Sequence, residues 1–211
     1  MTVPRFVVMA IKDRHEMTAA LLRQLTDADQ FFLFDNGSRV PFPGAASRPT
    51  ATIHQMWNEG LDAASAAAGG AAHDVAVLNN DLDVGPGFLT GLSRGLRSDD
   101  RNWLAFPDWQ GLCATDGEVR AISGREGNHL SGWAMLLRGE AGLRFDERFE
   151  WWYGDDDLQR QIETAGQRLV AVGGLRCVHL ESGWSTSASP VLQAKAEADQ
   201  VRFEKKWDNR S

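Results

Sequence analysis

Two aspartates one residue apart, Asp81 and Asp83, follow an apolar run and are the first candidates for chemistry in this chain. The run Asp74–Leu78 is typical of a buried strand, so the carboxylates come at the carboxyl end of a core element. Unpaired buried carboxylates cost several kcal/mol, and a divalent cation carrying a nucleotide diphosphate would compensate them. Because residues i and i+2 of an extended segment point the same way, we expect both carboxylates to face one cation.

A second acidic cluster, Asp155-Asp156-Asp157, follows the aromatic pair Trp151 and Trp152 after the two residues Tyr153 and Gly154. Three acids can act simply as charges at a helix N-terminus, where the helix dipole stabilises them. That role does not require the aromatic residues that precede them. A carboxylate near other acids and aromatic rings has a raised proton affinity, which suits general-base work. We expect the two tryptophans to line a site, whereas most of the others are expected in the core.

Four further polar residues are candidates for the site. His179 follows a short apolar run and is either a structural histidine or a metal ligand. Asn58 lies in a predicted helix, where it either packs or contacts a phosphate or ribose. Asp35 ends a predicted strand, where an Asx-turn is the simpler role. Asn80 precedes the first aspartate of the pair and belongs to the same polar cluster.

The first half of the chain alternates between strand-like and helix-like segments. Apolar runs predict strands over Phe6–Ile11, Gln30–Phe34 and Asp74–Leu78, and a helical spacing predicts helices over His15–Leu25 and Ile53–Ala68. This alternation implies right-handed crossovers and a parallel sheet, in which ligands bind at the carboxyl ends of the strands. Three of these ends carry polar clusters, at Lys12–Arg14, Asp35–Ser38 and Asn79–Asp83.

The second half is less regular, and the predicted fold is α/β, with a mostly parallel central sheet flanked by helices in one domain. The predicted elements are a loop at Pro41–Thr50, a helix at Phe88–Leu96, a hairpin near Cys113–Ile122, a strand at Trp133–Arg138, a helix at Leu158–Ala165, strands at Arg168–Val172 and Leu175–Val178, and a helix at Pro190–Trp207. We divide the chain into a nucleotide-binding half (1–84), an acceptor and catalytic half (85–189) and a C-terminal helix (190–211).

Composition excludes several classes of protein. A length of 211 residues suits one domain, and a net charge of −7 argues against a broad electrostatic grip on nucleic acid. Cys113 and Cys177 belong to no C-x-x-C pair, so two inert thiols in a reducing compartment are expected. The apolar run near the N-terminus is too short for a signal peptide, and no run approaches a membrane span. We therefore expect a soluble, cytoplasmic protein.

The order of these motifs resembles that of the large inverting family of nucleotide-sugar glycosyltransferases with the GT-A fold, including its rhamnosyltransferase-like branch. The resemblance runs from about residue 5 to about residue 184 and is specific through order and spacing. It is carried by F-V-V-M-A-I-K, F-D-N-G-S, W-N-E-G-L-D-A-A, L-N-N-D-L-D, F-D-E-R-F-E-W-W-Y-G-D-D-D-L-Q-R-Q-I-E-T-A-G and R-C-V-H-L.

The resemblance implies a metal and donor site. In that family the D-x-D binds a divalent metal and the nucleotide diphosphate, which implies Asp81 and Asp83 here, with Asp83 as the more direct ligand. A late histidine often completes the metal shell, which implies His179, and the carboxylate after the second strand contacts the base, which implies Asp35. The metal is Mn²⁺ or Mg²⁺, and a UDP-sugar is the first donor to consider. The predicted contacts to the nucleotide sugar are Asp35, Asn58, Asn80, Asp81, Trp151 and Trp152.

The resemblance also implies the catalytic base. The first Asp of the family's E-D-x-D-L segment corresponds to Asp155, and the Glu before it is Gly154 here, which leaves Asp156 as a competing candidate. The implied reaction is a single displacement. The base takes a proton from an acceptor hydroxyl as that oxygen attacks the anomeric carbon, whose configuration inverts.

Two other functions and several acceptors stay open. A nucleotidyltransferase would share the sheet and the acids, but it normally has a glycine- and lysine-rich loop where this chain has Lys12-Asp13-Arg14-His15. A non-catalytic module that binds a nucleotide or sugar is the other alternative, which the Gly154 departure keeps open. The acceptor is a saccharide, a lipid-linked sugar, a protein, a small molecule or a hydroxymethylated DNA base of the kind that phages decorate.

Overall fold

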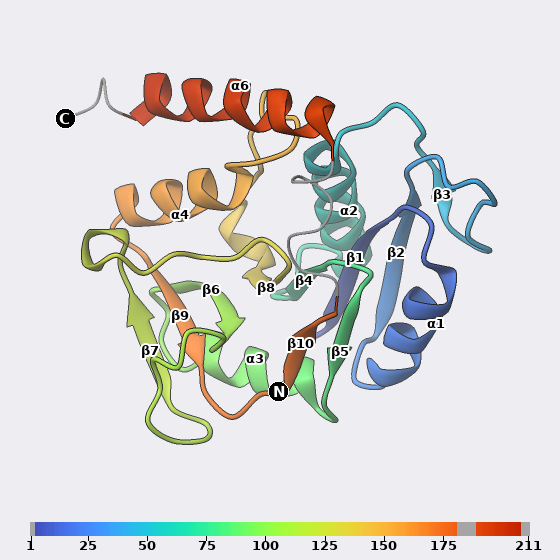
Figure 1. Ribbon diagram of the computed structural model, residues 1–211. Helices are drawn as coiled ribbons and strands as arrows, with labels where there is room; N and C mark the ends of the chain where they lie inside the picture. Colours follow the sequence, from blue (N-terminus) through green and yellow to red (C-terminus); the bar gives the residue numbers. More distant parts are fainter. Residues whose placement is uncertain (1–2, 181–188, 208–211) are drawn as a thin grey trace.

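The computed structural model describes residues 3–180 and 189–207 and is built on an eight-stranded sheet with helices on both faces (Figure 1). The sheet contains β1 (Arg5–Ile11), β2 (Gln30–Asp35), β3 (Ala46–Ser47), β4 (Asp74–Leu78), β6 (Asn102–Pro107), β7 (Val119–Ile122), β8 (Ala134–Arg138) and β9 (Arg168–Val172). A two-stranded sheet pairs β5 (Leu82–Val84) with β10 (Cys177–His179). The helices are α1 (His15–Gln24), α2 (Ile53–Ala68), α3 (Phe88–Leu96), α4 (Gly154–Thr164) and α6 (Pro190–Trp207), with 3₁₀ turns η1 (Gly124–Glu126) and η2 (Gly139–Ala141).

The strand order is β3-β2-β1-β4-β8-β6-β9-β7, and the strands at its centre bring the predicted polar clusters together. β1 pairs in parallel with β2 and with β4, with Met9 opposite both Leu33 and Leu78. The clusters that follow β1, β2 and β4 therefore meet at one edge of the sheet, as predicted. β8 lies antiparallel between β4 and β6, whereas β6 and β9 are again parallel. The predicted α/β architecture is confirmed.

Alternate residues of the central strands face two separate cores. Val8 and Val77 pack in the core that contains residues of α2 and α4. Val7 and Leu78 pack in the core that contains residues of α1 and α3. Because both faces of the sheet are covered, all 5 residues of β4 are buried, including Asp74 at its start.

Local sequence fixes the ends and the close packing of α2. Thr52 and Gln55 form a capping box at its start, and Gly69 ends it in the left-handed region with φ 59°. In the middle, Gly60 lets the helix lie directly on β1, because a Cβ there would come within 2.3 Å of Val8 Cγ1. These features account for a helix whose bounds agree with the prediction.

Some predicted elements differ from the structure. The predicted hairpin near Cys113–Ile122 is wrong, because its only strand, β7, pairs antiparallel with the distant β9 among the described residues. β6 lies in a stretch expected to be irregular, and the short β3 lies inside the predicted loop. α4 begins at Gly154, four residues before the predicted start at Leu158, because the acidic residues form its first turn.

Two observations bear on the class of protein. Within residues 3–180 and 189–207, no helix combines the length and the apolar character needed to cross a bilayer. Cys113 and Cys177 are free thiols. Burial raises the pKa of Cys113 to about 11 and that of Cys177 to about 12, so both stay protonated at neutral pH, as expected for unreactive thiols.

A buried ion pair joins α3 to the sheet. Asp74, at the start of β4, is 0% exposed, and burial raises the pKa of its carboxyl. Its oxygens accept hydrogen bonds from Ser93 Oγ at 2.5 Å and from Arg97 Nε at 2.9 Å. The same guanidinium also binds Glu140 and donates to the His73 carbonyl oxygen at 2.8 Å. Arg97 therefore neutralises a carboxylate that water cannot reach.

We expect Arg97→Met to lower the free energy of unfolding by about 3–5 kcal/mol, because it leaves Asp74 buried without its cation. Urea denaturation followed by circular dichroism measures this change. Arg101→Met is the matched control, because that guanidinium is mostly exposed and binds the surface residue Asp99. If both substitutions lower the free energy of unfolding by the same amount, the buried ion pair contributes no more to stability than the surface pair. Adding Asp74→Asn to Arg97→Met should restore part of the loss.

Candidate active site

Asp81 and His179 lie together, as the sequence predicted. The antiparallel pairing of β5 with β10 brings His179 Nε2 to 3.1 Å from Asp81 Oδ1. The other oxygen of Asp81 accepts a hydrogen bond from Arg14 Nη1 at 2.5 Å. Burial alone would raise the pKa of Asp81, but His179 and Arg14 hold it below its ordinary value. The imidazole stacks on the indole of Trp133, with ring centroids 5.5 Å apart and planes at 19°.

The loop between β1 and α1 carries Arg14 in an unusual conformation. Asp13 and Arg14 have φ values of 55° and 58°, in the left-handed region that residues other than glycine seldom adopt. Asn80 Nδ2 donates to the Asp13 carbonyl oxygen at 3.3 Å and to Thr18 Oγ1 at 3.1 Å. Asn80 thus fastens the loop to the segment that carries the buried aspartate, and the two polar clusters form one unit.

Asp83 has different partners. Its carboxylate accepts a hydrogen bond from Gln24 Nε2 at 2.8 Å and forms an ion pair with Arg176. Among the described residues, no group of three His, Cys, Asp or Glu side chains could hold a metal ion, so the predicted set of Asp81, Asp83 and His179 is not gathered. The prediction assumed an extended segment, but Asp81 lies in a bend before β5, where residues i and i+2 need not share a direction.

The two candidate bases lie in the first turn of α4. Asp155 Oδ2 accepts the Gly132 N–H at 2.7 Å, and its Oδ1 accepts the Asp156 N–H at 3.1 Å. Burial raises the pKa of Asp155 above its ordinary value. The pKa of Asp156 rises to about 6, first through burial and then through the charge of Asp155. His129 Nδ1 lies 4.0 Å from Asp156 Oδ1 and opposes this rise.

The dipeptide Gly132-Trp133 joins the two acidic clusters. Trp133 stacks on His179, which in turn contacts Asp81. The preceding Gly132 donates its N–H to Asp155. Clusters that are more than seventy residues apart in the sequence are therefore held on either side of one short segment, just before β8. No motif in the sequence marked this segment, because one of its contacts is made by a backbone group and the other by a ring face.

Asp35 forms the Asx-turn that was its simpler interpretation. Its Oδ1 accepts the Ser38 N–H and its Oδ2 accepts the Phe42 N–H, each at 2.8 Å. Burial works to raise the pKa of Asp35, but these donors hold it below its ordinary value. The carboxylate orders the loop after β2, and both of its oxygens are engaged in doing so.

Asn58 makes the contacts of a packing residue. Its Nδ2 donates to the Phe145 carbonyl oxygen and to Glu147 Oε1, both at 2.9 Å. Its Oδ1 accepts the Phe145 N–H at 3.0 Å. Asn58 therefore joins α2 to the segment that leads toward α4, and these bonds favour packing over contact with a ribose or phosphate.

Trp151 and Trp152 lie directly before α4, and Trp152 is 48% exposed. Their backbone N–H groups donate to Asp199 Oδ2 on α6, at 2.7 and 3.0 Å. Nothing in the sequence indicated this use of Asp199, because an acid in a charged helix is usually solvated. Tyr153 then turns the chain into α4 with φ 65°.

Gly154, the departure from the family pattern, is explained by His54 of α2. The buried imidazole donates through Nδ1 to the Phe149 carbonyl oxygen at 2.7 Å. A Cβ on Gly154 would come within 2.0 Å of His54 Nε2. A glutamate at this position is therefore incompatible with the histidine, and the glycine is a packing requirement.

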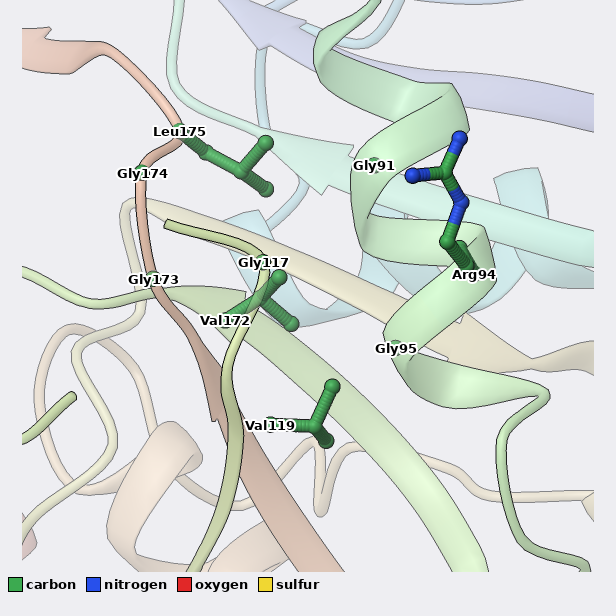
Figure 2. A pocket seen from close by; sticks show the side chains of 9 residues that line it. All are labelled: Gly91, Arg94, Gly95, Gly117, Val119, Val172, Gly173, Gly174 and Leu175. Atoms are coloured by element: carbon green, nitrogen blue, oxygen red, sulfur yellow. The ribbon is translucent and has the colours of Figure 1, made fainter. Parts of the chain in front are cut away.

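Two hollows lie near these elements, and the first has Asp83 in its lining. A groove of about 360 Å³ is lined by Glu16, Met17, Ala20, Gln24, Leu82, Asp83 and Leu180. A cavity of about 170 Å³ lies between α3 and the segments beside β7 and β9, and Figure 2 shows the residues that line it. Its lining is mostly glycine, with Arg94 of α3 beside it, and it includes no predicted site residue.

Comparison with known proteins identifies the fold. No protein-family model and no curated protein match the chain. Among solved structures, the chain is similar to the crystal structure of GalNAc-T7 with UDP, GalNAc and Mn²⁺, at a TM-score of 0.69 and 15% identity. The chain has the GT-A glycosyltransferase fold. The similarity covers 97% of this chain and 48% of that one, so this chain spans about half the length of GalNAc-T7. The rhamnosyltransferase-like branch stays a prediction.

We expect Gly154→Ala to lower the free energy of unfolding by about 1–3 kcal/mol, because the new methyl group overlaps His54. The same substitution in a His54→Ala background should cost much less, since the smaller side chain leaves room. Urea denaturation of the two single variants and the double variant measures the difference. If the substitution costs the same in both backgrounds, the histidine is not the reason for the glycine.

Proposed function

We propose that this chain is an inverting glycosyltransferase that moves a sugar from a nucleotide-diphosphate sugar to an acceptor hydroxyl. The supporting observation is the Gly132-Trp133 dipeptide, which contacts both Asp155 and the Asp81–His179 pair in a GT-A fold. UDP is the first donor nucleotide to test, because the structure of GalNAc-T7 contains it. The division into a nucleotide-binding half (1–84) and an acceptor half (85–189) is part of this proposal.

Asp81 and His179 are the proposed metal ligands. They present a carboxylate oxygen and an imidazole nitrogen 3.1 Å apart on adjoining segments. Mn²⁺ and Mg²⁺ accept such donors and complete their shells with phosphate oxygens and water, so two protein ligands fit an ion that arrives with a diphosphate. When bound, the ion supplies positive charge that stabilises the departing diphosphate. Asp83 is left out of the pair, because among the described residues it is not gathered with Asp81 and His179, and its partners are Gln24 and Arg176.

Other residues of the site bind and orient the donor. Arg14 brings a guanidinium to the same place as Asp81, where it suits the oxygens of a phosphate. Asn80 and Asp35 act by ordering the loops after β1 and β2, on which the nucleotide would lie. The indole of Trp152, which is half exposed, offers an apolar wall for a sugar or acceptor ring, and Trp151 accompanies it.

Asp155 is the proposed base. It takes the proton of the acceptor hydroxyl while that oxygen forms a bond to the anomeric carbon. The bond from the anomeric carbon to the phosphate oxygen breaks on the opposite side, its electron pair leaves with the diphosphate, and the configuration inverts. The raised pKa of Asp155 suits this role, because a base acts best when its pKa approaches the working pH. Asp156 is the alternative base.

UDP with Mn²⁺ should raise the melting temperature of the wild type by about 5 °C or more at a hundredfold excess over its Kd, through mass action. GDP, dTDP and CMP, each with and without Mn²⁺, complete the panel and identify the base of the donor. Asp81→Asn and His179→Ala should lose the shift that depends on the metal. Asp83→Asn is the matched control and should keep it.

A shift that survives Asp81→Asn but not Asp83→Asn would contradict the proposed ligand pair. The absence of a shift with every nucleotide would overturn the donor site itself, and the similarity to glycosyltransferases would then be one of fold only.

Turnover should rise with pH and then level off at a pH above the ordinary range of an aspartate, because the base works deprotonated and burial raises the pKa of Asp155. Asp155→Asn should lower kcat by about a hundredfold or more and keep nucleotide binding, whereas Asp156→Asn should cost less than about tenfold. Asp155→Asn should also lower the pKa of Asp156, since it removes a neighbouring charge. Carboxyl ¹³C NMR and kcat/KM profiles from pH 5 to 9 measure these effects.

A larger loss of kcat in Asp156→Asn than in Asp155→Asn would assign the base to Asp156. A panel of saccharides, lipid-linked sugars, small hydroxyl compounds, peptides and DNA with hydroxymethylated bases tests the acceptor. Nucleotide binding without transfer to any of them would favour the non-catalytic binding module. The packing of Gly154 against His54 gives that glycine a structural reason that does not depend on a loss of catalysis.

A further inference from the structure

Helix α6 buries a single acidic side chain next to the candidate base. Figure 1 shows the helix lying along the outer side of α4 and α2. Of its described residues only Asp199 is buried, at 0% exposed, whereas Val191 and Val201 are 66% and 63% exposed. A helix that is mostly polar has little apolar surface with which to hold its position. The buried carboxylate therefore indicates what the helix is fixed to.

The carboxylate of Asp199 receives several consecutive backbone donors. Its Oδ2 accepts the N–H groups of Glu150 at 3.0 Å, Trp151 at 2.7 Å and Trp152 at 3.0 Å. Its Oδ1 accepts from Arg202 Nη1 at 2.6 Å and from Glu150 at 3.1 Å. Hydrogen bonds to an ionised acceptor are stronger than neutral ones, and such a set offsets the cost of burying the charge.

The segment that Asp199 holds leads directly into the candidate base. After Trp152 the chain turns at Tyr153, whose φ of 65° is unusual for a residue other than glycine. The Tyr153 ring packs on Phe203 of α6, with centroids 5.2 Å apart. Asp155 follows two residues later. A backbone in this conformation persists only where its surroundings determine it, and here α6 supplies them.

A second contact of α6 lies on the other side of Asp155. Asp157 is 0% exposed, and its Oδ1 accepts hydrogen bonds from Lys206 Nζ at 2.6 Å and from Trp207 Nε1 at 2.9 Å. The first turn of α4 is thus attached to α6 both before and after the candidate base. A packing role alone would not require two buried carboxylates around this turn.

We propose that Asp199 is a positioning residue, which sets the orientation of Asp155 and of the two tryptophans by holding the backbone of residues 150–152. This inference rests on the proposed function, in which Asp155 is the base. Asp199 touches neither donor nor acceptor. Because geometry at a reacting atom strongly affects rate, loosening the segment should lower turnover and leave donor binding, which uses Asp81 and His179, almost unchanged.

Asp199→Asn tests the proposal, because it keeps the size of the side chain and removes its negative charge. The backbone N–H groups of residues 150–152 then face either a neutral amide oxygen or an NH₂ group that cannot accept their hydrogen bonds. Val201→Ser, on the exposed side of the same helix, is the matched control. Hydrogen exchange at the amides of residues 150–152 should accelerate by about tenfold or more in Asp199→Asn only. In the same variant kcat should fall by about tenfold or more, while the Kd for UDP with Mn²⁺ stays within about twofold.

An unchanged exchange rate at residues 150–152, or a kcat within about twofold of wild type, would overturn the proposal. A parallel fall of kcat, donor affinity and unfolding cooperativity would also overturn it, since that pattern indicates a purely structural role. If Asp199→Asn does not fold, Phe203→Leu replaces it, because this change removes the ring contact with Tyr153 and keeps the carboxylate. It should lower kcat without changing the donor Kd.

Failure of the proposed function would look different. A wild type that transfers no sugar to any acceptor overturns the glycosyltransferase assignment. Two measurements then still decide whether α6 sets the environment of the acidic pair. They are hydrogen exchange and the ¹³C titration of Asp155 and Asp156, each compared between wild type and Asp199→Asn. A titration and an exchange pattern that are both unaltered would overturn the positioning role independently of turnover.

Discussion

A carboxylate that is withdrawn from water must find cations or N–H donors, and this requirement determines how the elements of the chain are joined. Asp74 pairs with Arg97 and so fixes α3 to the sheet. Asp81 finds a guanidinium and an imidazole from two other segments. Asp199 finds backbone amides before α4. Asp155 differs, because in the described part of the chain it is bonded to two backbone N–H groups and to no Lys or Arg. Burial therefore raises the pKa of Asp155, which agrees with its proposed role as the base.

The parallel strands and the acidic helix contribute different halves of the candidate site. The edge formed by β1, β2 and β4 orders the loops that carry charge and hydrogen-bond donors. The first turn of α4 carries the base candidates, and its position depends on α6 and on Gly132. The packing of His54 against Gly154 adds a third support from α2. Chemistry at this place therefore requires three helices that are not adjacent in sequence to keep their relative positions.

The alternation of strands and helices in the first half was predictable, because local apolar periodicity and turn residues determine it. The D-x-D geometry was not, because a bend at Asp81 separates the directions of two side chains that an extended strand would align. The pairing of β7 with β9 and the contact of Asp199 with Trp151 join residues about fifty positions apart. No local pattern encodes such contacts. The same holds for Trp133, whose ring stacking on His179 depends on the fold and not on a motif.

The pairing of β5 with β10 also has a consequence for the order in which the protein assembles. Asp81 and His179 are separated by 98 positions in the chain. During synthesis the strands of the first half can pair early, but Asp81 gains its imidazole partner only after residue 179 has left the ribosome. Arg14 precedes Asp81 in the chain, so its guanidinium is available to that carboxylate much earlier. The ion pair of Asp81 with Arg14 can therefore form before the contact with His179.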